Sequence, residues 1–337
     1  MAHVRSLAIG LSLLTVLPSL APAAAPAVTR EEVEQAIKDG VRFLKDSQNK
    51  DSGSWPDAND FNQGGTQGAS ALATLALLTA GEPATEPHVA RALAHLDSFD
   101  AARLGGTYAV SLQTMAFALA DPVRYKVQIA RNVFWLERAQ IRPGDGVPWP
   151  GSWTYDDRKG RQGDISNTQY ALLGLQAATE VGIPVKPEVW ALARQFWESG
   201  QHRGGLDDGS WGYNPRDNSS GTASRTCAGV ASLIIAGMKR YEGLEVLTPD
   251  GAIRNCGKGG FNPDILRGIN WLAANFRVGE NFGNGHVWKY YYLYGLERVG
   301  RLSGLRYIGD HDWYFEGAEH LVHDRNHDPL SGKWRGS

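Results

Sequence analysis

Six degenerate copies of one short pattern run through the chain, and they constrain its fold more than any other feature. The clearest copy reads as a helix end followed by a glycine–aromatic turn: Gly40-x-x-Phe43-Leu44-x-x-x-Gln48-x-x-x-x-Gly53-Ser54-Trp55. Its aromatic or histidine position recurs at Phe43, His95, Trp135, Phe196, Trp271 and His320, in steps of 52, 40, 61, 75 and 49 residues. Repeats at such periods indicate stacked helical units, because one unit cannot bury its apolar face alone.

Three of the copies keep both the glutamine and the Gly-Ser-Trp end of the pattern. Besides the copy above, these are Gln140 with Gly151-Ser152-Trp153 and Gln201 with Gly209-Ser210-Trp211. The other three are weaker, with Asp100, Phe276 and Arg325 at the glutamine position.

This pattern resembles the QW motif of the squalene cyclase and terpene cyclase superfamily, whose relatives include the protein prenyltransferase β subunits. The resemblance covers nearly all of the chain after residue 25. It implies an all-α fold of the α/α toroid type, in which an outer ring of helices surrounds an inner ring and a cavity. Only three residues follow Trp334, so the six repeats would form a double ring of helix pairs with the last inner helix missing.

Apolar periodicity predicts two alternating sets of helices. Apolar residues at three- and four-residue steps, such as Val33, Ile37 and Val41, mark the amphipathic outer set. The outer helices are expected near 31–48, 86–99, 123–140, 187–200, 263–276 and 314–324. The second set is more apolar and should be more deeply buried, and it covers 66–80, 108–119, 166–181, 224–241 and 288–299.

The N-terminus is a separate segment. Arg5 precedes an apolar run from Leu7 to Leu20, and small residues follow at 21–25. This arrangement is typical of a secretory signal peptide. Residues 1–25 are therefore predicted to be a signal peptide, the protein to be exported (periplasmic or secreted), and residues 26–337 to form one toroid domain. The alternative is an uncleaved membrane anchor.

Composition supports a large core and argues against one class of partner. Hydrophobic residues make up 42% of the chain, which contains 11 Trp. The net charge is −2, so no nucleic-acid partner is expected. The only cysteines, Cys227 and Cys256, would form one disulfide or remain two unpaired thiols in an exported chain. Neither has a second ligand at zinc spacing, and we expect no metal and no other cofactor.

Candidate site residues lie where the predicted inner helices begin, because in the resembled family these helix starts converge on one mouth of the cavity. They form four groups: Asp60, Asn62 and Gln63; Asp164, Ser166, Asn167 and Gln169; Ser224, Arg225 and Thr226; and His286, Trp288 and Lys289, with a tyrosine run after them. Asp164 is the candidate catalytic acid. The candidate substrate-binding residues are Asn167, Gln169, Arg225, Trp288 and Tyr291.

Each candidate also has a structural alternative. Asp and Ser are residue types that commonly cap helix N-termini, so Asp164 and Ser166 would do so without any catalysis. Arg225 is of a type more often found salt-bridged at a surface, and most of the tyrosines after residue 289 would pack between the two rings. For acid catalysis, an apolar wall would have to raise the pKa of Asp164.

The chain departs from the resembled enzymes at their reactive groups. Hopene-type cyclases protonate an alkene with an Asp-x-Asp-Asp motif, and the nearest string here is Asp310-His311-Asp312-Trp313. Trp288 stands where the prenyltransferases have a zinc-binding histidine. Two functions therefore stay open. One is an exported protein that binds an isoprenoid-like apolar molecule or lipid, with cyclase- or lyase-like activity if a carboxylic acid acts as catalyst. The other is a non-catalytic scaffold for a protein or glycan, with a protein partner at the open sixth repeat.

Overall fold

The computed structural model describes residues 28–56, 65–158, 160, 162–214, 219–241, 246–247, 253–254, 262–324, 327–328 and 333–334. Helices dominate this part of the chain, and each of its strands is two residues long. The predicted all-α class is therefore confirmed. The segment 1–25, the candidates Asp60, Asn62 and Gln63, and Cys256 lie outside the described residues.

Most of the helices match the two predicted sets. The outer set consists of α1 (Arg30–Ser47), α3 (Pro87–Asp97), α6 (Lys126–Ala139), α8 (Pro187–Gly200), α10 (Pro263–Ala274) and α12 (Trp313–Val322). The inner set consists of α2 (Gly65–Thr79), α5 (Thr107–Ala120), α7 (Ile165–Glu180), α9 (Ala223–Tyr241) and α11 (Lys289–Ser303).

Short elements occupy the connections between these helices. They are the helix α4 (Ala101–Leu104), the 3-10 turn η1 (Gly205–Asp207), and the antiparallel pairs β1 (Val246–Leu247) with β2 (Ile253–Arg254), β3 (Tyr307–Ile308) with β4 (His311–Asp312), and β5 (His327–Asp328) with β6 (Lys333–Trp334).

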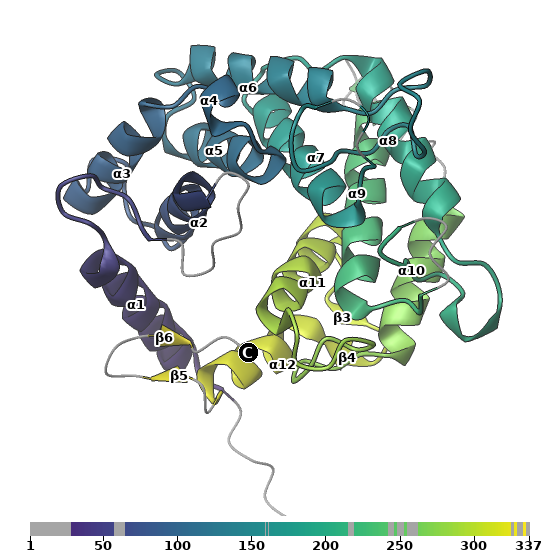
Figure 1. Ribbon diagram of the computed structural model, residues 1–337. Coiled ribbons are helices and arrows are strands. Elements are labelled where there is room, and N and C mark those ends of the chain that lie inside the picture. Colours follow the sequence, from purple (N-terminus) through teal and green to yellow (C-terminus); the bar gives the residue numbers. More distant parts are fainter. Residues whose placement is uncertain are drawn as a thin grey trace, which may run out of the picture.

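The two sets occupy different parts of a curved array. Figure 1 shows the outer set on its outside and the inner set nearer its middle. Consecutive inner helices pack on one another from α2 through α5, α7 and α9 to α11, and α6 packs on both α5 and α7. The first and last helices, α1 and α12, are also in contact. In the described residues α12 is followed by β5 and β6 and by no further helix.

Local sequence sets where the outer helices begin. At α1, the Glu32 backbone N–H donates to Thr29 Oγ1 (3.2 Å), and the Thr29 N–H donates to Glu32 Oε2 (2.8 Å). This reciprocal cap satisfies two N–H groups that the helix itself leaves unpaired. Prolines open α3, α8 and α10, where a missing N–H removes no helical hydrogen bond.

The three complete copies of the repeated motif share one set of tryptophan contacts. Each indole N–H donates to the carbonyl four residues before the motif glutamine. The pairs are Trp55 with Leu44 (2.7 Å), Trp153 with Leu136 (2.7 Å) and Trp211 with Trp197 (3.0 Å). The three tryptophans are buried, so they are packing residues within the repeats.

The motif glutamines connect each repeat to the next. Each Nε2 donates both to the motif glycine carbonyl and to a carbonyl in the first turn of the next outer helix. The acceptors are Gly53 and His88 for Gln48, Gly151 and Val189 for Gln140, and Gly209 and Asp264 for Gln201. One side chain therefore fixes both the turn and the docking of the following helix.

The motif glycine is required by both conformation and space. Gly53 has a φ of +75°, and a Cβ added there would lie 2.6 Å from the carbonyl oxygen of Arg91 in α3. Gly151 and Gly209 have φ values of +94° and +93° and approach the backbones of α8 and α10 in the same way. A side chain at these positions would push the next outer helix away.

Small residues bring the inner helices close together. A Cβ at Gly174 of α7 would lie 2.9 Å from the Cα of Ser111 in α5, and one at Gly295 of α11 would lie 3.0 Å from the Cβ of Cys227 in α9. Cys227 itself is a buried free thiol. None of the helices in the described part of the chain is long and apolar enough to cross a bilayer.

Candidate functional site

The repeated motif positions Asp164 at the start of an inner helix. The Asp164 N–H donates to the carbonyl of Trp153 (3.0 Å), and the Trp153 N–H donates to Thr168 Oγ1 (3.0 Å) one turn into α7. Because Trp153 is itself anchored on α6, the loop returns Asp164 to the N-cap of α7. The expected capping role of Asp164 is confirmed by this geometry.

The Asp164 carboxylate is buried and held by three donors. Oδ1 accepts from the Asn167 backbone N–H and from Ser166 Oγ, both at 2.9 Å, and Oδ2 accepts from Asn167 Nδ2 at 2.8 Å. Only 4% of the residue surface is exposed. Asn167 is therefore a direct partner of the candidate acid.

Tyrosines from three inner helices and one loop form a connected group, and three of them lie near this carboxylate. The Tyr170 ring centroid lies 4.7 Å from that of Tyr108 on α5, and 6.4 Å from those of Tyr291 and Tyr294 on α11. Tyr108, Tyr213 and Tyr291 all interact electrostatically with Asp164. We call Asp164 with these five tyrosines the acid–tyrosine cluster.

Three buried polar atoms in and beside the cluster have no hydrogen-bond partner among the described residues. They are Asn167 Oδ1, Gln169 Nε2 and Tyr294 Oη. On its other side, Gln169 accepts a hydrogen bond from the Tyr291 hydroxyl at 2.5 Å. Buried polar groups in proteins are nearly always paired, so these atoms are suited to a polar group that enters the cluster.

Burial decides the protonation of the cluster. It raises the pKa of the Asp164 carboxyl above its ordinary value, and the hydrogen bonds from Asn167 and Ser166 offset only part of that effect. Burial also raises the pKa of Tyr108 and of Tyr291 well above the ordinary phenol value. Nearby Tyr291 and Asp164 add to this effect for Tyr108, and Tyr170 and Asp164 add to it for Tyr291. These phenols are therefore neutral hydrogen-bond donors.

The structure brings four of the six predicted site residues together. Asp164, Asn167, Gln169 and Tyr291 all belong to the cluster or hydrogen-bond to it. Arg225 lies at its edge, with its guanidinium carbon 5.5 Å from the Tyr213 ring centroid.

Trp288 is placed differently from the other predicted residues. It is 53% exposed and forms the N-cap of α11 with a φ of +60°. The left-handed conformation is uncommon for a bulky residue, and it turns the chain into α11.

Sequence reasoning did not single out Tyr108, Tyr170 and Tyr213. Tyr108 stands at the Trp position of the second, weaker motif copy. Tyr155 and Tyr213 each follow a motif Trp by two residues, and they hydrogen-bond to each other. This recurrence was the available signal, because equivalent positions in stacked repeats face the same way.

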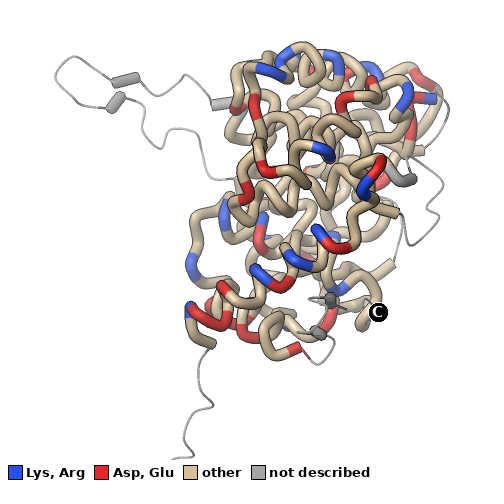
Figure 2. The backbone as a smooth tube through the Cα atoms, turned by 90° about the vertical axis from the view of Figure 1, so that its left-hand side faces the viewer, with Lys and Arg blue, Asp and Glu red and all other residues tan. Residues whose placement is uncertain are grey.

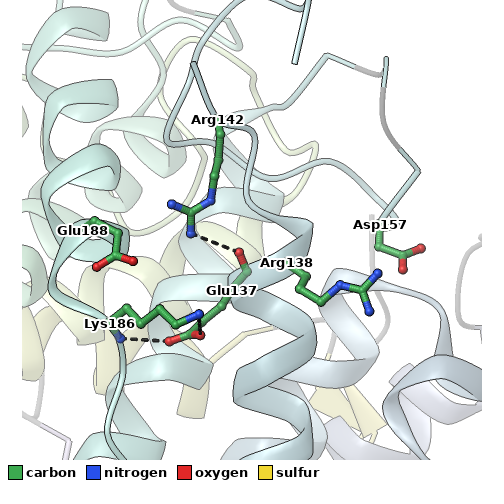
Figure 3. A pocket seen from close by; sticks show the side chains of 6 residues that line it. All are labelled: Glu137, Arg138, Arg142, Asp157, Lys186 and Glu188. Atoms are coloured by element: carbon green, nitrogen blue, oxygen red, sulfur yellow. Dashed lines mark hydrogen bonds and ion pairs between the residues drawn. The ribbon is translucent and has the colours of Figure 1, made fainter. Parts of the chain in front are cut away.

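A separate charged pocket lies on the outer helices, between the end of α6 and the start of α8 (Figure 3). It has a volume of about 380 Å³ and is lined by Glu137, Arg138, Arg142, Asp157, Lys186 and Glu188. Glu137 accepts from the Lys186 backbone N–H (2.8 Å) and from its Nζ (3.1 Å). These contacts join two outer helices, so we read the pocket as structural.

A buried ion pair holds the end of α12 to α11. Lys289 Nζ lies 2.7 Å from Asp324 Oδ2, and Tyr290 Oη donates to the same oxygen at 3.2 Å. The predicted mouth residue Lys289 is therefore engaged in a packing contact. Among the described residues no group of His, Cys, Asp and Glu is arranged to hold a metal ion.

No protein-family model matches the chain, and a comparison with curated proteins gave no match.

Proposed function

We propose that the protein is an exported α/α toroid of the terpene cyclase and prenyltransferase type, which binds an isoprenoid-like apolar ligand at the acid–tyrosine cluster. The observation that carries this proposal is a buried carboxyl with a raised pKa, at the start of an inner helix, with Tyr108, Tyr213 and Tyr291 near it. The resemblance of the repeated motif supports the toroid and the ligand class. Contact between α1 and α12 is what a closed ring requires.

The cluster has the parts needed for acid catalysis on an alkene. Protonated Asp164 would give its proton to one carbon of a C=C bond, forming a C–H bond from the π electrons and leaving a carbocation on the other carbon. The faces of Tyr170 and Tyr291 would stabilise that cation, because π faces attract positive charge. Loss of a proton or addition of water would then end the reaction, and the carboxylate would regain a proton.

A second candidate function is a non-catalytic scaffold for a protein or glycan. The observation favouring it is that the Asp164 carboxylate caps α7 through the Asn167 backbone N–H and accepts two further hydrogen bonds from side chains of that helix. In that case the tyrosines would serve packing alone, and a partner would bind elsewhere on the ring.

Two experiments separate these candidates. Native mass spectrometry of protein purified from its own membrane fraction, followed by lipid extraction, tests for a bound apolar molecule. Incubation with squalene as a test polyene, followed by mass spectrometry of the products, tests for turnover.

Asp164→Asn is the matched variant for the second experiment. Asn caps nearly as well as Asp, and the Asn167 amide can turn so that its unpaired Oδ1 accepts from the new side chain. We expect the variant to fold and to bind ligand but to lose turnover. Full turnover in the variant would remove Asp164 as the acid, and absence of any apolar ligand from the native protein would favour the scaffold.

A further inference from the structure

The outward side of α6 carries a regular line of arginine and apolar side chains. Arg124, Val127, Arg131, Phe134 and Arg138 follow one another at steps of three and four residues, so they share one side of the helix and the turn before it. Val127 and Phe134 are 58% and 57% exposed, and all three arginines are exposed. The opposite side of α6 is buried in the core.

Further residues widen this surface without adding negative charge to it. Lys126 is exposed, and Val123 is 85% exposed. The only acid between residues 122 and 138 is Glu137, which is buried and paired with Lys186. Asp97 and Asp121 flank the surface. We call the exposed residues of 123–138 the basic–apolar surface.

Three cations of this surface are available to a partner, while the Arg138 guanidinium lies over the Phe134 ring, 5.6 Å from its centroid. Within the described part of the chain Arg124, Lys126 and Arg131 form no ion pair. Figure 2 shows Lys and Arg along the upper edge of the molecule, the edge that α4 and α6 form in Figure 1. The whole chain has a net charge of −2, so this positive surface is a local feature.

We propose that the basic–apolar surface docks the protein on an anionic lipid membrane. Guanidinium groups bind phosphate head groups through several donors, and apolar side chains between them enter the boundary between head groups and acyl chains. A second copy of the chain fits this surface less well, because symmetric pairing would set arginines against arginines. The surface is independent of the acid–tyrosine cluster, so the proposal does not depend on the function of that cluster.

The test is co-sedimentation of the purified protein with vesicles, either pure phosphatidylcholine or a mixture with phosphatidylglycerol. We expect binding to the anionic vesicles, weakened by high salt. Lys126→Gln/Arg131→Gln should lower the binding constant about 25-fold, at roughly fivefold per cation near an anionic surface. Val127→Ser/Phe134→Ser should also weaken binding, and both pairs are exposed, so the fold should survive.

The matched control is Lys38→Gln/Lys50→Gln, which removes the same charge from exposed positions on α1 and its following loop. It should bind like the unaltered protein. Equal loss in the control would show that general charge, rather than this surface, drives binding. No binding to anionic vesicles would overturn the proposal, as would self-association that the α6 variants abolish in size-exclusion chromatography without any vesicle binding.

Discussion

At Asp164 one carboxyl serves as a helix cap while burial opposes its ionisation. The pKa of Asp164 is raised in the folded protein, so the folded state holds this proton more tightly than the unfolded chain does. Its contribution to stability is therefore full below the ordinary value of 3.8 and is lost as the pH rises through the folded pKa.

A pH series on a variant that cannot ionise tests this reading. As the pH rises from about 4 to about 7, Asp164→Asn should gain free energy of unfolding relative to the unaltered protein, measured by urea unfolding. Asp46→Asn, at an exposed carboxyl, serves as the control. A constant difference across the series would show that burial does not govern this carboxyl.

The hydrogen bond between Tyr291 and Gln169 supports a second prediction at the residue scale. Tyr291→Phe removes the donor and leaves Gln169 Oε1 buried without its partner. The free energy of unfolding should fall by about 1–3 kcal/mol. Tyr307→Phe, at a residue 49% exposed, should have little effect. Equal melting temperatures for the two variants would contradict the assigned contact.

The candidate site was predictable from the sequence where polar side chains stand at the start of a predicted inner helix. Asp164 and Asn167 stand out because polar residues at the start of an apolar helix are conspicuous. Tyr170 does not, since an aromatic residue inside an apolar helix usually signals packing. Trp288 was predicted to bind substrate because of its neighbours in the sequence. It is half exposed, and it occupies a left-handed N-cap that no residue pattern indicates.

At the scale of the element, the motif tryptophan is the main anchor between a helix and its loop. Trp211 is fully buried and donates to Trp197. Trp211→Ala should destabilise the protein by about 3–5 kcal/mol, because a large cavity and an unpaired carbonyl remain. The control is Trp288→Ala at the half-exposed position. Thermal unfolding would measure both, and a similar melting temperature for the two would deny the anchor role.

The motif glycine gives a second prediction for the element, with an internal control. Gly53 and Gly146 have nearly the same φ, +75° and +76°, but only Gly53 faces a neighbouring backbone, while nothing lies within 4 Å of a Cβ at Gly146. Gly146→Ala should therefore lower the free energy of unfolding only by its conformational strain, about 1–2 kcal/mol. Gly53→Ala should cost clearly more in urea unfolding, since α3 must move. Equal losses of unfolding free energy in the two variants would mean that the positive φ alone, and not the close backbone of α3, requires glycine at position 53.

The helices themselves were largely predictable, because apolar period, prolines and caps agree for most of them. The outer helix expected at 123–140 is α6 at Lys126–Ala139. Helix α4 and the two-residue strand pairs were not predicted. They are shorter than any periodic signal, and tertiary contacts determine them.

For the whole molecule, the contact between α1 and α12 is the feature that the repeat periods alone do not reveal. Repeat periods predict how neighbouring units stack, but they say nothing of whether the first unit meets the last. In the structure, the buried pair of Lys289 and Asp324 fixes the end of α12 on α11, and α12 in turn contacts α1.

Breaking that ion pair should therefore loosen both ends of the chain. Asp324→Asn leaves the Lys289 ammonium buried without a counter-charge, which typically costs about 3–5 kcal/mol. Amide hydrogen exchange should become faster in α12 and also in α1, while α5 and α7 stay protected. Unchanged exchange in α1 would show that the contact between the terminal helices contributes no stability.

The sequence separation between each motif glutamine and its acceptor sets an order in which the repeats can form their hydrogen bonds. Gln48, Gln140 and Gln201 find their acceptors 40, 49 and 63 residues further on, in the next outer helix. In a chain synthesised from its N-terminus, each of these glutamines therefore lacks one acceptor until the first turn of the next outer helix has formed. At these three joints the later helix completes the earlier repeat, and α1 gains its contacts with α12 and β6 only when the end of the chain arrives.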